Sequence, residues 1–156
     1  MIPYIAVVGP SAATAKEGLA AREVGRLLAE AGAVVVTGGH QGVMAAASHG
    51  AAEAGGVVVG ILPGTDRAEA NPWVTVAIPT GLGELRNGLV VRASDAVVAV
   101  GGSWGTLSEV ALALRTRVPV IALGFWELPA PDGGPVAEVA SDPADAARRA
   151  LAHARR

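Results

Sequence analysis

Apolar residues occur in six short blocks along this chain, and amphipathic or alanine-rich stretches separate the blocks. The blocks cover residues 4–8, 33–36, 57–62, 74–78, 96–100 and 118–123. Most of them are continuously apolar rather than alternating, which is typical of strands that are covered on both faces. We therefore expect the blocks to be the strands of a buried parallel sheet.

The stretches between the blocks have the features of helices. Residues 14–17 have the spacing of a capping box and begin a stretch with an apolar stripe that reaches Gly32. Further helices are predicted over 43–54, 85–94 and 105–114, and a last one begins at Ser141-Asp142-Pro143. Residues 124–135 are predicted to be a loop. Strands that alternate with helices predict a Rossmann-like, doubly wound α/β fold with right-handed crossovers.

The length and the charge narrow the choice of class. A chain of 156 residues is expected to form one domain, residues 1–156. It has no cysteine, so disulfides and thiolate metal sites are excluded. The net charge is −2, and no basic run is longer than a pair such as the terminal Arg155-Arg156, so we expect neither nucleic acid nor a membrane as partner. Without a spanning segment or a charged leader, a cytoplasmic protein is expected.

Glycine-containing loops follow each of the first five predicted strands. Ligands of such sheets bind beyond the carboxyl ends of the strands, where these loops converge. The loops contain Gly9-Pro10-Ser11, Gly38-Gly39-His40-Gln41-Gly42, Pro63-Gly64, Pro79-Thr80-Gly81 and Gly101-Gly102.

The loop at 101–109 carries the strongest chemical signal. Glycines let the main chain approach a phosphate, and the first N–H groups of the following helix point at it. Thr106 adds a hydroxyl, and Glu109 adds a carboxylate one turn into the helix. Together with the second double-glycine loop at 38–42, this pattern predicts a site for a phosphate-bearing, nucleotide-like small molecule.

Several common nucleotide and cofactor sites are absent from the sequence. No G-x-G-x-x-G follows the first strand, and Thr37 ends the second strand in place of an acidic residue, which disfavours a nicotinamide dehydrogenase. No P-loop motif is present. The single lysine, Lys16, lies in the first turn of a surface helix, which disfavours a pyridoxal phosphate enzyme. The three histidines are not spaced as a metal site, and we expect none.

Taken alone, each candidate side chain also has a structural interpretation. Arg86 could be a surface arginine or a partner of Glu84. Glu109 could be a first-turn carboxylate that the helix dipole favours. Asn87 could be a turn or capping residue. Trp104 could stack on a base, fill the core or contact another subunit.

Two motifs together resemble a known family. Residues 38–44, GGHQGVM, resemble the GGG-x-x-G-[LV]-M loop of the LOG ("lonely guy") superfamily. Residues 101–109, GGSWGTLSE, resemble its PGG-x-GT-x-x-E motif, and Arg86 matches an arginine on the helix before that motif. The resemblance extends from Ile5 to about Leu123. Asn71-Pro72-Trp73 and the segment 78–87 are similar to a smaller branch of mostly unknown function, which also resembles molybdenum-cofactor carrier proteins.

The resemblance implies an activity and an assembly. LOG enzymes hydrolyse the N-glycosidic bond of cytokinin nucleoside 5′-monophosphates and release the base and ribose 5-phosphate, and no cofactor is required. Their arginine and glutamate are catalytic, which transfers to Arg86 and Glu109. Breaking the C1′–N bond builds positive charge on the ribose, which Glu109 would stabilise while Arg86 orients the substrate. A homo-oligomer, dimer or tetramer, is implied as well.

The sequence also departs from the enzyme pattern. Ser103 stands where the motif has its second glycine, and Ser108 stands where the enzymes have the first of two glutamates. The loop 65–71 differs from the expected base-binding region. Beside a phosphoribohydrolase, the sequence therefore allows a non-catalytic carrier of molybdenum cofactor or of another phosphorylated pterin or nucleotide, and less readily a nucleotide-sensing domain.

The predicted site combines the catalytic pair with a set of residues that bind phosphate or the rest of the ligand. The catalytic residues are Arg86 and Glu109. The binding residues are Gly9, Ser11, Gly38, Gly39, His40, Gly42, Val43, Met44, Pro63, Asn87, Gly101, Gly102, Ser103, Trp104, Gly105 and Thr106.

Overall fold

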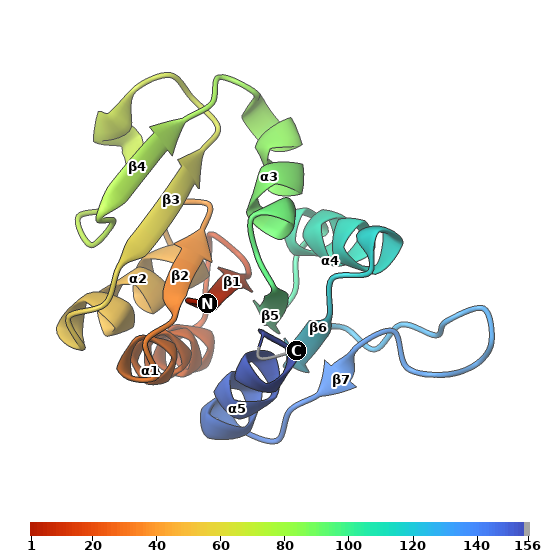
Figure 1. The fold of residues 1–156 in the computed structure, drawn as a ribbon. Helices are drawn as coiled ribbons and strands as arrows, with labels where there is room; N and C mark the ends of the chain where they lie inside the picture. Colours follow the sequence, from red (N-terminus) through yellow and green to blue (C-terminus); the bar gives the residue numbers. More distant parts are fainter. Residues whose placement is uncertain (155–156) are drawn as a thin grey trace.

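The computed structural model describes residues 1–154, so Arg155 and Arg156 lie outside the described residues. Seven parallel strands form one sheet in the order β4-β3-β2-β1-β5-β6-β7 (Figure 1). The strands are β1 (Tyr4–Val8), β2 (Val34–Thr37), β3 (Val58–Leu62), β4 (Val76–Pro79), β5 (Ala96–Val100), β6 (Val120–Leu123) and β7 (Glu138–Val139).

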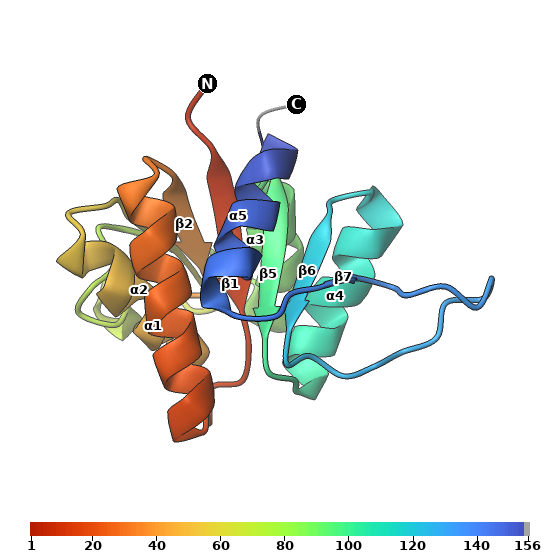
Figure 2. The same ribbon diagram turned by 90° about the horizontal axis from the view of Figure 1, so that it is seen from below.

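Five α-helices cover the sheet, and two short 3-10 helices lie in its connections. The α-helices are α1 (Ala15–Glu30), α2 (Val43–Glu53), α3 (Asn87–Arg92), α4 (Trp104–Thr116) and α5 (Pro143–Ala154), and the 3-10 helices are η1 (Arg67–Glu69) and η2 (Gly83–Arg86). Helices α1, α2 and α5 lie on one face of the sheet, and α3 and α4 lie on the other (Figures 1 and 2). The predicted Rossmann-like, doubly wound fold is confirmed.

Strands β1, β2, β3, β5 and β6 are buried on both faces, as their continuous apolar blocks predict, whereas the edge strands β4 and β7 are more exposed. Along β1, Ile5 and Val7 belong to the core under α1, α2 and α5, whereas Ala6 and Val8 belong to the core under α3 and α4. Successive side chains of a strand point to opposite faces, so a strand between two helix layers needs apolar residues at every position.

The two neighbouring helices α1 and α2 pack at very short range. A Cβ atom on Gly25 of α1 would lie 2.0 Å from the carbonyl oxygen of Ala47 in α2. At Gly50 of α2, a Cβ would lie 1.8 Å from the carbonyl oxygen of Arg22 in α1. These two glycines let the main chains touch, and this contact sets the position of α2 over the sheet.

The strand order reverses next to β1, which pairs with β2 on one side and with β5 on the other. The chain leaves β1 and β5 in opposite directions at their carboxyl ends, so a crevice forms there. The loops after β1, β2 and β5 meet at this point. The predicted convergence of the glycine loops is therefore confirmed.

Four elements differ from the sequence prediction. The fourth strand is displaced to Val76–Pro79, and the helix expected over 85–94 is divided into η2 and α3. Gly83, with φ +58°, begins η2 in a left-handed conformation that a regular helix does not allow. Strand β7 and helix η1 were not predicted, because β7 has two exposed residues and no apolar block.

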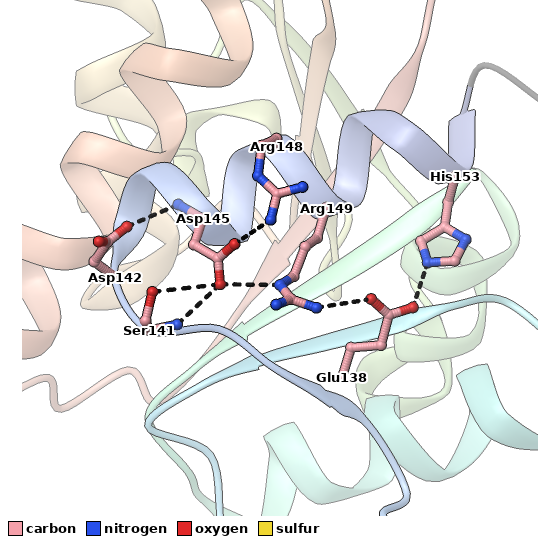
Figure 3. Close-up of polar contacts among 7 residues, drawn as sticks. All are labelled: Glu138, Ser141, Asp142, Asp145, Arg148, Arg149 and His153. Carbon is pink, nitrogen blue, oxygen red and sulfur yellow. Dashed lines mark hydrogen bonds and ion pairs between the residues drawn. The ribbon is translucent and has the colours of Figure 1, made fainter.

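Strand β7 is held in the sheet by side chains of α5 (Figure 3). The guanidinium of Arg149 donates to Asp145 at 2.9 Å and lies 3.6 Å from the carboxylate of Glu138 in β7. His153 contacts the same Glu138 at 2.5 Å. The pKa of Asp145 lies well below its usual value, mainly because its carboxylate accepts a hydrogen bond from the main-chain N–H of Ser141. Hydrogen bonds from Arg149 and Arg148 lower this pKa further.

The segment between β6 and β7 projects from the body as an arm, which both views show (Figures 1 and 2). Within residues 1–154, no helix has the length and apolar character that crossing a membrane requires.

Candidate functional site

A cavity of about 390 Å³ lies at the carboxyl edge of the sheet, where the strand order reverses. It is bounded by the loops after β1, β2 and β3, by η2 and the start of α3, and by the first turn of α4. Twelve of the predicted site residues line it: Gly9, Ser11, Gly38, His40, Met44, Pro63, Arg86, Asn87, Ser103, Gly105, Thr106 and Glu109.

Six predicted residues do not line the cavity, namely Gly39, Gly42, Val43, Gly101, Gly102 and Trp104. Val43 is fully buried in the core, and the Trp104 side chain is 79% exposed. Trp104 instead contacts the ring of Trp126 edge-on, with ring centroids 5.2 Å apart.

The four glycines outside the cavity wall are explained by close packing or by a positive φ. A Cβ on Gly42, which has φ +67°, would lie 2.3 Å from the carbonyl oxygen of Pro10. At Gly101, with φ +68°, it would lie 1.8 Å from the carboxylate of Glu17. Gly39 lies against Leu62, and Gly102 lies against Trp126. These glycines lie behind the cavity wall and allow the loops to fold tightly, and residues next to them in the sequence line the cavity.

The sequence analysis missed several residues of the site. Val7, Val8, Gly83 and Glu84 also line the cavity. Val7 and Val8 lie at the end of β1, and Gly83 and Glu84 lie in η2 before Arg86. Their positions next to predicted loop and site residues were the signal that could have identified them.

Asn71, which the sequence analysis names only within the motif Asn71-Pro72-Trp73, holds the loop that follows β2. Its amide nitrogen donates to the carbonyl oxygens of Gly39 at 3.2 Å and His40 at 2.9 Å, and its side-chain oxygen accepts from the N–H of Trp73. The side chain is 3% exposed. Asn71 therefore fixes the entry to α2 from the far end of the β3–β4 connection.

The N-terminus of α2 presents free main-chain donors near the cavity. Val43 donates its N–H to the carbonyl oxygen of Pro10, and Ala46 donates to Gly42. The N-cap residue Gly42 has no side chain to accept from Met44 and Ala45. Within the described chain, these two amides have no partner. Such amides, together with the helix dipole, attract an anion.

The first turn of α4 forms another wall. Ser103 caps this helix, because its Oγ accepts from the N–H of Thr106 at 3.2 Å. The hydroxyls of Ser103 and Thr106 lie 2.9 Å apart and are hydrogen bonded. The serine that departs from the enzyme motif thus satisfies one of the helix donors, and Trp104 and Gly105 retain the free amides of the first turn.

Arg86 carries the positive charge of the cavity. One terminal nitrogen of its guanidinium donates to the side-chain oxygen of Asn87, and the other makes a long contact of 3.5 Å to the carbonyl oxygen of Gly38. Its Nε is buried and lacks a hydrogen-bond partner. Burial lowers the pKa of Arg86, and the charge of Glu109 acts against this. Within residues 1–154, no carboxylate lies within 4 Å of this guanidinium.

Glu109 is the buried carboxyl group of the cavity, with 7% of its surface exposed. Burial raises its pKa to about 8, because the low-polarity surroundings disfavour the charged form more than Arg86 favours it. At neutral pH this carboxyl is therefore mainly protonated and can donate a hydrogen bond. The interior of the cavity thus combines a guanidinium, two helix N-termini and a neutral carboxyl group.

The outer part of the cavity is more polar and more open. His40 lies 3.8 Å from the carboxylate of Glu69 in η1, and Glu84 is exposed. Among residues 1–154, no group of three or more His, Asp or Glu side chains is arranged to hold a metal ion. The Arg86 guanidinium, which has no carboxylate within 4 Å among residues 1–154, and the two helix N-termini are suited to an anion such as a phosphate.

Solved structures with clear sequence similarity share this fold over their whole length. The molybdenum cofactor binding protein from the phototrophic bacterium Rippkaea orientalis is 40% identical, covers 97% of both chains and superimposes with a TM-score of 0.91. The molybdenum cofactor carrier protein from Chlamydomonas reinhardtii is 36% identical, covers 97% of this chain and 99% of its own, and has a TM-score of 0.82.

A curated relative from Archaeoglobus fulgidus, an uncharacterized protein, is 40% identical over 119 residues, which are 76% of this chain and 78% of the relative. The SLOG cluster4 family matches residues 2–149, and this match confirms the predicted resemblance to the LOG-like proteins. Since the match covers nearly the whole sequence, the chain belongs to the SLOG cluster4 family.

Proposed function

We propose that this protein is a carrier that binds the molybdenum cofactor, or another phosphorylated pterin, in the cavity at the carboxyl edge and releases it unchanged. The observation that carries the proposal is a half-buried guanidinium with no carboxylate within 4 Å among the described residues, in a fold that matches a molybdenum cofactor binding protein at a TM-score of 0.91. An anionic ligand would supply the missing counter-charge.

The size and polarity of the cavity support this proposal. Its volume of about 390 Å³ is within the usual range of small-molecule sites. The free amides of Met44 and Gly105 would receive the phosphate, with Arg86 beside them. The neutral carboxyl of Glu109 adds no negative charge that would repel it.

A phosphoribohydrolase is the second candidate, because Arg86 and Glu109 line the same cavity. In that reaction, positive charge develops on the ribose, and a charged carboxylate would stabilise it. At neutral pH the raised pKa of Glu109 leaves few molecules in the charged form. This protonation state favours binding without hydrolysis.

The carrier is tested by purifying the protein without oxygen from cells that make the cofactor, and by measuring the fluorescent pterin that oxidation releases from it. We expect stoichiometric pterin with the unaltered chain and little with Arg86→Gln. Arg92→Gln removes an exposed arginine of α3 outside the cavity and should retain the pterin. Equal pterin content in all three proteins, or none in the unaltered chain, would contradict the proposal.

The hydrolase is tested separately with AMP, N6-substituted AMP, GMP and CMP. Release of ribose 5-phosphate above the level of an Arg86→Ala/Glu109→Ala double variant would establish it and would displace the carrier as the main function. A homo-oligomer remains a prediction from the resemblance.

A further inference from the structure

A continuous chain of hydrogen bonds connects Arg86 to the first turn of α4. Arg86 donates to the side-chain oxygen of Asn87, the side-chain nitrogen of Asn87 donates to Ser108 Oγ at 3.0 Å, and Ser108 Oγ donates to the carbonyl oxygen of Gly105 at 2.7 Å. We propose that Asn87 and Ser108 are positioning residues that hold the Arg86 guanidinium in place for a phosphate group at the N-terminus of α4. The inference rests on the proposed function only in taking the cavity as an anion site.

In this chain of hydrogen bonds, the donors and acceptors available at each group determine the direction of every bond. The hydroxyl of Ser108 has one hydrogen, which goes to the carbonyl oxygen of Gly105, so toward Asn87 it can only accept. Asn87 must then turn its nitrogen to Ser108 and its oxygen to Arg86, since a guanidinium has donors only. Ser108 therefore fixes the orientation of an amide that would otherwise be free to turn its nitrogen toward the guanidinium.

The position of the Arg86 side chain depends on these hydrogen bonds, because it has few other contacts. Its other contact, to the carbonyl oxygen of Gly38, is long at 3.5 Å, and its Nε has no partner. An arginine without support has many rotamers and loses their entropy when it binds a ligand. Support by Asn87 means that the guanidinium is ordered before the anion arrives.

The chain of hydrogen bonds also joins the two groups that the proposal assigns to the anion, the Arg86 guanidinium and the N-terminus of α4. Asn87 begins α3, whereas Ser108 and Gly105 belong to the first turns of α4. Asn87 is 8% exposed, so its bonds are shielded on the α3 side. The guanidinium and the free amides of α4 are thereby kept at a constant separation, which is what a phosphate bound by both requires.

The experiment compares the affinity for inorganic phosphate, measured by calorimetry, among variants of the whole chain. Ser108→Ala should weaken phosphate binding by about three- to tenfold, which is the usual effect of one lost hydrogen bond. Ser108→Thr retains the hydroxyl and should restore the affinity. Thr116→Ala serves as control, because Thr116 is a half-buried α4 residue outside the cavity whose hydroxyl also donates to a carbonyl oxygen, that of Leu112. It should leave the affinity unchanged.

A double variant separates positioning from a general loss of stability. If Ser108 acts through Asn87, adding Ser108→Ala to Asn87→Ala should cause no further loss of affinity. The inference would be overturned if the fold-losses of phosphate affinity in the two single variants multiplied in the double variant. An unchanged affinity of Ser108→Ala would also overturn it. Failure of the unaltered chain to bind phosphate would also overturn it. A chain that binds phosphate in this pattern but retains no pterin would leave the inference standing and remove the proposed function.

Discussion

Glu109 makes the stability of the protein depend on pH. Its pKa rises from an ordinary 4.5 to about 8 on folding, so between these values the folded chain holds a proton that the unfolded chain has released. Stability therefore falls as the pH rises through this window, by up to about 1.4 kcal/mol per pH unit. We expect the urea midpoint to fall between pH 5 and pH 8 and to level off above it.

The control for this prediction is Glu109→Gln, which keeps the shape and stays neutral at every pH. Its urea midpoint should vary less over the same range, and above pH 8 it should exceed that of the unaltered chain. Glu84→Gln alters an exposed carboxylate of the same cavity and should keep the original slope. An unchanged slope in Glu109→Gln would show that another group is responsible.

The same ionisation should control anion binding. When Glu109 loses its proton above pH 8, it places a negative charge in the cavity beside Arg86. Sulfate, whose own charge is constant in this range, should then bind more weakly at pH 9 than at pH 6.5. Calorimetric titration of Glu109→Gln should show nearly equal affinities at the two pH values. Equal affinities in the unaltered chain would place the anion away from Glu109.

For single residues, the sequence predicts where a side chain lies better than it predicts whether the side chain is protonated or which groups it contacts. The resemblance to the LOG superfamily indicated that Arg86 and Glu109 lie together, because both match catalytic residues of its enzymes, and the glycine loops indicated the carboxyl edge of the sheet as the place of the site. The protonation of Glu109 could not be predicted, since it depends on burial by other elements. The role of Asn71 was equally hidden, because its partners Gly39 and His40 are more than thirty positions away.

Among the elements, α1 contains two glycines with opposite expected effects. A Cβ on Gly18 would meet nothing within 4 Å, whereas one on Gly25 would lie 2.0 Å from the main chain of α2. Gly18→Ala should stabilise the protein by about 0.5–1 kcal/mol, because alanine favours the helix. Gly25→Ala should destabilise it by about 1–3 kcal/mol, because α1 and α2 must separate.

Thermal and urea unfolding measure both effects, and each variant is the control for the other. Because α2 begins at the cavity, Gly25→Ala should also weaken phosphate binding, whereas Gly18→Ala should not. Stabilisation by both variants would mean that the two helices do not touch as closely as their glycines indicate.

The elements also show what the sequence pattern can and cannot predict. Five of the six predicted strands are buried on both faces and therefore continuously apolar, whereas the edge strand β4 is half-exposed and its predicted bounds were displaced. Strand β7 lacks that property, since Glu138 and Val139 are exposed. Its place depends on Arg149 and His153 of α5, which are contacts between distant parts of the chain (Figure 3).

On the scale of the whole molecule, exposed leucines lie next to the cavity wall. Leu85 is 79% exposed and Leu89 is 42% exposed, whereas Glu84, Arg86 and Asn87 of the same segment line the cavity. Exposed apolar residues that gather on one face indicate a contact with another subunit. An interface here would bring a second copy close to the bound ligand.

We therefore predict that the homo-oligomer forms through η2 and α3, and that Leu85→Glu dissociates it. A charge buried in an apolar contact without a partner is costly, so light scattering should show a smaller species for this variant. Leu19→Glu alters a leucine of α1 that is 71% exposed on the opposite face of the sheet, and it should leave the assembly unchanged. If the assembly responds to Leu19→Glu instead, the subunits meet through α1. In that case ligand binding and assembly use separate faces, and the pterin content of the Leu85→Glu variant should equal that of the unaltered chain.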